Sequence, residues 1–212
     1  MKRICTALLG ALSTSLLYLQ PCAALADDGP QESLFETTLF GSYRFGGGFE
    51  KSGTSDKVHL DDGAAYAIAF NWEAADNAYY EISYSRQDAK LKTTPSFDLT
   101  IDYLQIGGYV TFENNPQRRV VPYFLMTVGA ARYTPKTTAL QEQTKFAAAI
   151  GTGVKFPITS HLAIRLDGRM YATFFENQND VFCSFPAGGC VVSLHGETLL
   201  QTHVSLGFTA GF

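Results

Sequence analysis

The residues of this sequence that come closest to a hydrolytic site are His203 and Ser205. They stand two positions apart in a stretch that alternates in polarity, and side chains at positions i and i+2 of a strand point to the same side. An acid on a neighbouring strand would complete an arrangement of nucleophile, base and acid. Whether the chain could hydrolyse anything therefore depends on the elements that surround this pair.

Charged side chains recur in segments that otherwise alternate between apolar and small or polar residues. They are Glu36, Arg44, Glu73, Glu81, Lys145, Lys155, Arg165, Asp167 and Arg169. Inside a narrow barrel, charges of both signs can pair with one another and fill the lumen. We favour such a structural network over the alternative, in which the same residues line a narrow path for small solutes.

Two cysteines stand close together near the end of the chain. Cys183 and Cys190 flank a stretch that contains Pro186 and two glycines, and we expect a disulfide between them because exported proteins fold in an oxidising compartment. A metal site is the competing idea, but it needs more ligands than two isolated cysteines supply. We therefore expect no metal and no cofactor.

The first 26 residues have the features of a secretory signal peptide. Lys2 and Arg3 precede an apolar run from Ile4 to Leu19, and residues 24–26 offer the small-x-small pattern of a cleavage site. A transmembrane helix is the alternative, although the run is shorter than the ~20 residues that a span needs. We expect a signal peptide over residues 1–26 and a barrel domain over residues 27–212.

The mature chain has a mild excess of acid. Removing the two basic residues of the leader from the 16 in the whole chain leaves 14, against 20 acidic residues, which is a formal charge of −6. A chain of this charge without a basic cluster is not expected to bind nucleic acid.

Segments that alternate in polarity repeat along the mature chain, and none shows a helical period. In the last one, Leu206 and Phe208 fall on one face, while Ser205 and Gly207 fall on the other. Eight such segments can be counted, and the fifth, near residues 123–133, alternates least cleanly. Repeated segments of this kind are typical of membrane-spanning β-strands. The sequence therefore predicts an all-β fold, an eight-stranded antiparallel up-and-down transmembrane β-barrel.

The connections between these segments alternate in length. Short polar turns are expected at residues 74–77, 114–119 and 157–160, and longer stretches at residues 50–63, 88–99, 134–143 and 176–197. Outer-membrane barrels place short turns on the periplasmic side and long loops outside. This order puts both ends of the chain in the periplasm and the two late cysteines in the fourth external loop.

The polarity pattern favours lipid outside the barrel over a soluble barrel with an apolar interior. Charges stand in the middle of the polar faces, and aromatic residues on the apolar faces gather at the expected strand ends, as in the two aromatic girdles of membrane barrels. One girdle would hold Trp72, Tyr80, Phe112, Phe156 and Phe212, and the other Tyr43, Phe45, Tyr66, Tyr84 and Phe174.

Several short stretches, in their order, resemble the small outer-membrane β-barrels of the OmpA, OmpX and opacity-protein type. They are residues 41–47 (GSYRFGG), 103–108 (YLQIGG), 122–123 (PY), 151–155 (GTGVK) and the terminal Phe212. The resemblance implies the outer membrane of a Gram-negative bacterium. It also implies that Phe212 is the signal read by the barrel-assembly machinery, and that the partners include outer-membrane lipid and lipopolysaccharide. The fourth external loop carries apolar residues around the expected disulfide, namely Phe182, Phe185, Pro186, Val191 and Val192. Its tip could contact a host surface, another protein or lipopolysaccharide, and the alternative is a stapled loop that is only protected from proteolysis.

The function that we expect is a structural or surface-interaction role, as an adhesin or in envelope integrity, without catalysis. A narrow, porin-like channel is the first alternative. A lipid A-modifying hydrolase is the second, because outer-membrane lipid A deacylases carry His and Ser on barrel strands. Those enzymes hold the pair on the lipid-facing side, whereas His203 and Ser205 are expected on the luminal face, with flanking residues that differ from that family.

Overall fold

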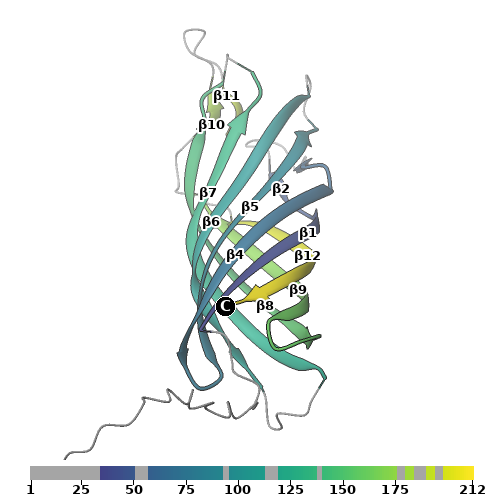
Figure 1. The fold of residues 1–212 in the computed structure, drawn as a ribbon. Helices are drawn as coiled ribbons and strands as arrows, with labels where there is room; N and C mark the ends of the chain where they lie inside the picture. Colours follow the sequence, from purple (N-terminus) through teal and green to yellow (C-terminus); the bar gives the residue numbers. More distant parts are fainter. Residues whose placement is uncertain are drawn as a thin grey trace, which may run out of the picture.

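Eight antiparallel strands close into a barrel in the order β1-β12-β9-β8-β7-β6-β5-β4 (Figure 1). This computed structural model describes residues 34–50, 57–92, 96–112, 119–137, 140–175, 180–183, 190–193 and 198–212. The barrel strands are β1 (Phe35–Phe45), β4 (Gly63–Ala75), β5 (Ala78–Leu91), β6 (Phe97–Thr111), β7 (Val121–Pro135), β8 (Gln143–Pro157), β9 (Leu162–Phe174) and β12 (Thr198–Gly211). The predicted fold is confirmed, while the expected signal peptide lies outside the described residues.

The first and last strands of the barrel complete its wall. β1 pairs with β12 from Glu36 opposite Gly211 to Phe45 opposite Thr202, and Phe35 and Phe212 exchange backbone hydrogen bonds of 3.2 and 3.0 Å. Because every barrel strand has a neighbour on both sides, the sheet has no free edge. That is the condition for placing strands in a medium without water.

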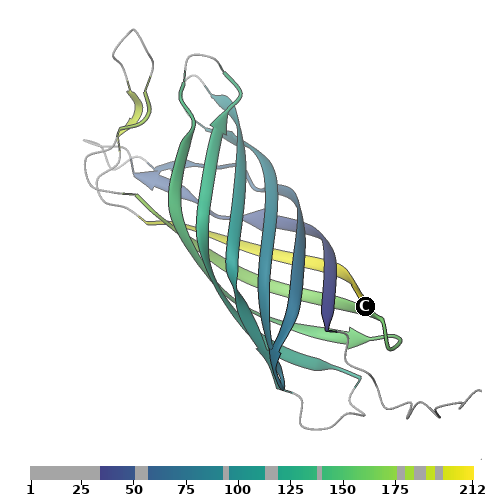
Figure 2. The same cartoon turned by 60° about the vertical axis from the view of Figure 1, so that its left-hand side comes forward.

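Two small hairpins lie outside the barrel wall. One pairs β2 (Gly48–Glu50) with β3 (Lys57–His59), and the other pairs β10 (Asp180–Cys183) with β11 (Cys190–Ser193). Figure 2 shows the β10–β11 hairpin beyond the end of the barrel that lies opposite the chain terminus. We call this end the loop end and the opposite end the turn end.

The chain between β1 and β4 bends at two glycines and returns to the barrel. Gly46 and Gly47 have φ angles of +79° and +104°, which side chains rarely allow. After the β2–β3 hairpin, the Leu60 amide donates to the Gly47 carbonyl at 3.0 Å, and the Leu60 side chain is buried against the cluster at the loop end of the lumen. The first external segment is therefore anchored to the mouth of the barrel.

Side chains alternate between the outside and the lumen along each strand. In β9, Ile164, Leu166 and Met170 are exposed, whereas Arg165 and Asp167 are buried. The sense is apolar outside and polar inside, as expected for strands in lipid. All but two of the girdle residues named from the sequence are exposed on the outside, and Trp72 and Tyr84 are partly buried.

The expected strand boundaries at the loop end are wrong. Residues 88–91 belong to β5 and residues 97–99 belong to β6, so these strands run further than the predicted loop allowed. In this extension the polarity is reversed: Asp88 and Lys90 face outward and are exposed, while Leu91 and Leu99 face the lumen and are fully buried. This is the pattern of a strand whose outer face meets water, so the reversal marks the edge of the lipid-facing band.

The part of the chain that the structure describes contains no helix that is long and apolar enough to span a membrane.

A charge placed at the middle of the lipid-facing band should be costly. Leu39 is 61% exposed and lies midway along β1 between the outward-facing Phe35 and Tyr43. We expect Leu39→Arg to lower the free energy of unfolding in lipid vesicles by about 2–4 kcal/mol, because a guanidinium at the bilayer midplane loses its hydration. Urea titration of the refolded protein measures this value.

Leu34 provides the matched control, because it is 64% exposed and precedes β1 at the turn end. Leu34→Arg should cost no more than about 1 kcal/mol at the interface. Equal costs at the two positions would contradict the placement of the lipid-facing band.

Candidate functional site in the barrel interior

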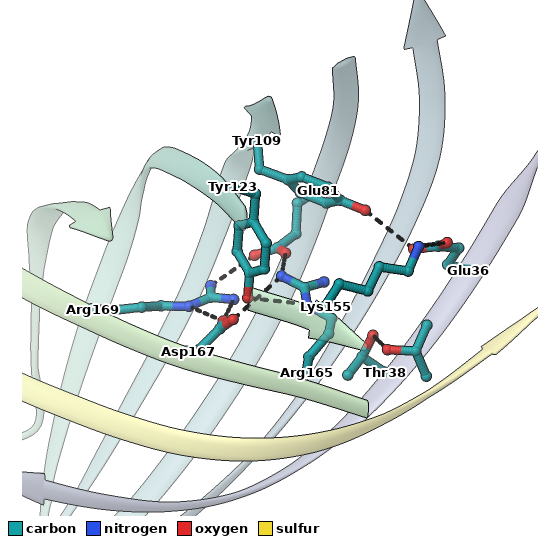
Figure 3. Close-up of polar contacts among 10 residues, drawn as sticks. Glu36, Thr38, Glu81, Tyr109, Tyr123, Lys155, Arg165, Asp167 and Arg169 are labelled. Carbon is teal, nitrogen blue, oxygen red and sulfur yellow. Dashed lines mark hydrogen bonds and ion pairs between the residues drawn. The ribbon is translucent and has the colours of Figure 1, made fainter. Parts of the chain in front are cut away.

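A network of buried ion pairs fills the middle of the lumen (Figure 3). The Glu81 carboxylate of β5 lies between two arginines of β9, at 2.7 Å from Arg169 Nη1 and 3.4 Å from Arg165 Nη2. Asp167 accepts from Arg169 Nε at 2.9 Å and lies 3.6 Å from Arg165 Nη2. The side chains of Glu81, Asp167 and Arg165 are fully buried, so solvent does not screen these charges.

The strand register explains how these four charges meet. Arg165, Asp167 and Arg169 occupy alternate positions of β9, and side chains at such positions share one face of a strand. Glu81 reaches them across the lumen from the opposite wall. Asn71 of β4 joins the network, since its amide in the orientation that satisfies both neighbours donates to Glu81 at 3.0 Å and accepts from Arg165 at 3.2 Å.

Aromatic rings enclose the Arg165 guanidinium. Its central carbon lies 4.7 Å from the centre of the Tyr123 ring, 4.9 Å from that of Tyr109 and 5.4 Å from that of Phe40. A planar cation is stabilised over such ring faces, and Tyr123 also accepts a hydrogen bond from Arg165 Nε at 3.2 Å. The charge is therefore held by rings as well as by carboxylates.

A second ion pair lies toward the turn end of the lumen. Lys155 of β8 donates to Glu36 of β1, and the Tyr109 hydroxyl donates to the same carboxylate at 3.1 Å. Figure 3 shows Glu36 and Lys155 beside the Arg165 group. The Lys155 side chain is 16% exposed, so this pair is close to the end of the buried region.

The space beside two luminal glycines is occupied by aromatic rings from the neighbouring strands. A Cβ at Gly207 would collide with the ring of Phe40, its partner on β1, and a Cβ at Gly153 would collide with the ring of Tyr123, its partner on β7. These rings lie over the glycines and pack against the arginines. The sequence did not lead us to expect Phe40 and Tyr123 among the interior groups, although each stands at an inward position of a strand.

An apolar layer closes the loop end of the lumen. Its buried members are Leu60, Ala89, Leu91, Leu99, Ile101, Tyr103, Ala131, Tyr133, Ala147, Ala149, Tyr171, Phe175 and Leu199. Two tyrosine hydroxyls in this layer have hydrogen-bond partners. Tyr103 donates to Gln201 at 2.8 Å, and Tyr133 donates to Thr173 at 3.1 Å. The lumen is thus apolar at the loop end and ionic toward the turn end.

The nine charges named from the sequence do not form one group. Arg44 is fully buried in a separate layer, where it donates to Ser85 and, at 3.5 Å, to Gln87. Glu73 and Lys145 are only partly buried and lie near opposite ends of their strands. The remaining six make up the two ion-paired groups described above: Glu36, Glu81, Lys155, Arg165, Asp167 and Arg169.

His203 and Ser205 are both buried in the lumen, at 2% and 3% exposure. Among the described residues, neither ring nitrogen of His203 has a hydrogen-bond partner, so the histidine is joined neither to Ser205 nor to a carboxylate. General-base activation of a serine needs that hydrogen bond, and a hydrolytic site is not assembled in this arrangement.

Charged residues also form an outer belt on the extension of β5, β6 and β7. Arg86 lies 2.6 Å from Asp102, Lys136 lies 3.0 Å from Asp88, and Lys90 lies 3.7 Å from Asp98. These side chains point away from the lumen just beyond the lipid-facing band. The belt carries ion pairs that water can screen.

Cys183 and Cys190 stand opposite each other in the ladder between β10 and β11. The disulfide itself stays a prediction, because the structure describes only the backbone of these strands. No Lys or Arg follows Arg169, so both cysteines lie in one tryptic peptide, residues 170–212. We expect this peptide from the non-reduced protein to be lighter, by the mass of two hydrogen atoms, than the same peptide after dithiothreitol, and mass spectrometry measures this. Complete alkylation of both thiols without reductant would contradict it.

Removal of the central carboxylate should destabilise the barrel. Glu81→Gln keeps the shape of the side chain but leaves Arg165 and Arg169 with one carboxylate, that of Asp167, between them. Because a broken buried pair leaves a charge uncompensated, we expect a loss of about 3–5 kcal/mol in the free energy of unfolding. Urea titration of the refolded barrel gives the value.

The exposed pair between Lys90 and Asp98 supplies the comparison. Asp98→Asn should change the free energy of unfolding by no more than about 1 kcal/mol. A small effect of Glu81→Gln, similar to that of the control, would mean that water screens the interior network.

Comparison with known proteins agrees with this geometry. The structure is similar to that of Neisserial surface protein A, with a TM-score of 0.57, 16% sequence identity, and coverage of 85% of this chain and 98% of that one. OprG from Pseudomonas aeruginosa gives a TM-score of 0.57 at 10% identity, with coverage of 87% and 99%. At these identities the likeness shows the fold alone. No curated protein sequence matches the chain.

The family assignment comes from the sequence match. Residues 10–195 match the model of the outer membrane protein beta-barrel domain, which is most of the chain. The resemblance noted from the sequence and the expected localisation are confirmed. The chain belongs to the outer membrane β-barrel protein family, and its place is the outer membrane.

Proposed function

We propose that this protein is a non-conducting barrel that serves the outer membrane as a structural element and presents its loop end at the cell surface, without catalysis. The observation that carries the proposal is the filled lumen. Ion pairs with fully buried side chains occupy the middle, and a continuous apolar cluster covers the loop end.

The filled lumen argues against the alternative of a small-solute channel. A hydrated ion would have to separate Arg169 from Glu81, which are 2.7 Å apart, and then cross a layer that includes Leu91, Leu99 and Leu199. Both steps are unfavourable, because the first leaves buried charges unpaired and the second offers an ion no polar partner. Rearrangement of the loop end alone would not open this path.

The loop end offers the surface for an interaction with partners. The outer belt of β5, β6 and β7 faces away from the lumen, next to the exposed Leu104 and to Tyr84, whose hydroxyl donates to Asp102 at 2.7 Å. Basic groups at this level, such as Arg86 and Lys136, would meet the phosphorylated headgroups of lipopolysaccharide. The two hairpins that extend the loop end are then placed for a host or surface ligand.

A planar bilayer tests whether the lumen is closed. We expect the purified barrel to insert without producing a steady ohmic conductance, because no described part of its interior offers a hydrated path. An established porin, added to the same bilayer, checks that insertion and recording work. Reproducible single-channel steps that scale with the salt concentration would overturn the proposal in favour of the channel.

A further inference from the structure

Arg44 is a buried cation that belongs to neither of the two ion-paired groups in the lumen. It is 0% exposed, and no carboxylate of the described residues lies within ion-pair distance of it. Its guanidinium donates to neutral Ser85 and Gln87 and lies over the rings of Tyr103 and Tyr171, at 4.8 and 5.5 Å. The rings and the polar side chains lower the free-energy cost of burying this charge, but they do not neutralise the charge.

No described carboxylate of the interior is left over for Arg44. Three arginines are buried in the lumen, Arg44, Arg165 and Arg169, and the partly buried Lys155 pairs with Glu36, one of three buried carboxylates, the others being Glu81 and Asp167. All three carboxylates already serve the other cations. A buried charge without a counter-charge is among the most costly features of a protein interior.

A cavity lies next to Arg44. Its lining includes Ser83, Ser85, Gln105, Arg169, His203 and Ser205, and no carboxylate. Arg44 is not among the lining residues, but it contacts three of them, Ser85, Tyr103 and Tyr171, and stands opposite a fourth, His203, in the ladder between β1 and β12.

The groups around this cavity have unused hydrogen-bond donors. Nε2 of Gln105 is buried without a partner, while its Oε1 accepts from Thr127 at 3.2 Å. Both ring nitrogens of His203 and Nε of Arg44 are likewise buried without partners. Amide and guanidinium N–H groups donate hydrogen bonds, a neutral imidazole donates through one ring nitrogen and accepts through the other, and serine hydroxyls can donate as well. Such a lining is complementary to an acceptor that carries negative charge.

We propose that this cavity binds one monovalent anion of halide size, with Arg44 as its counter-charge and Gln105 and His203 as hydrogen-bond donors. The cavity has a volume of about 10 Å³, which is close to the least space that holds a single water-sized ligand. A cation is disfavoured by Arg44 and Arg169. A water molecule would satisfy the donors but would leave Arg44 without a counter-charge.

The anion would complete the packing of the lumen. With it, Arg44 has a counter-charge, and the polar layer between the apolar cluster and the ionic network is neutral. This inference is independent of the surface role, since it concerns the interior and holds whether or not the loop end binds a partner. A barrel that conducts could still bind the anion.

Bromide replaces chloride and can be located by its anomalous scattering. We expect crystals of the detergent-solubilised barrel grown in bromide to show an anomalous peak in the lumen beside Arg44, Gln105 and His203. We also expect the Tm of the barrel in solution to rise when chloride or bromide replaces gluconate at constant ionic strength. The rise should saturate at about 5 °C.

Arg44→Gln separates this site from general salt effects. The variant should lose both the anomalous peak and the halide-dependent rise in Tm, and in gluconate it should be at least as stable as the unaltered protein because it buries no unpaired charge. Arg86→Gln is the matched control, because Arg86 lies outside the lumen and pairs with Asp102. Its halide response should equal that of the unaltered protein.

Two results would overturn the proposal. One is a lumen of the unaltered protein without anomalous density in bromide, whether it holds a water molecule or nothing, together with equal Tm values in halide and gluconate. The other is a halide response that persists in Arg44→Gln. The crystals of the unaltered protein decide the question even if the variant fails to fold.

Discussion

The absence of water in the bilayer core is the constraint on which the rest of this structure depends. Each backbone amide and carbonyl at that depth must find a partner within the protein. The chain meets this requirement by pairing β1 with β12 along their length, so that eight strands close into a wall without a free edge. Closure then fixes where the side chains go, because apolar groups can face lipid only if their neighbours along the strand face the lumen.

Closure turns the charged faces of the strands toward one another in a narrow space. There, each ionic group needs a counter-charge or hydrogen bonds to offset the loss of water. Glu81 between Arg165 and Arg169, and Glu36 beside Lys155, meet this need across the lumen. Aromatic rings that lie over glycines on the neighbouring strands fill part of the remaining space. Arg44 differs from these cations because no described carboxylate pairs with it. For this reason we propose an anion in the layer around it.

The same strands serve two environments along their length. Within the lipid-facing band, apolar side chains point outward and polar ones inward. Beyond it, on β5 and β6, Lys90 and Asp98 point outward while Leu91 and Leu99 point inward. On these two strands the wall therefore continues with a water-facing outer side, and its inner side joins the apolar cluster at the loop end. A single ladder of strands thus combines a membrane anchor with a rigid extension at the surface.

The sequence by itself determined the barrel, its number of strands, the sense of its faces and most of its aromatic girdles, because alternation with a period of two is local and can be counted residue by residue. It also named His203, Ser205 and the interior charges. It did not determine the reversal of polarity at Leu91 and Leu99, since the edge of the lipid is not a local property of a strand. Only the tertiary structure decided which charges meet, which ring lies over Gly207 and which cation stays unpaired. Those contacts join residues far apart in the chain, and strand register and closure alone bring them together across the lumen.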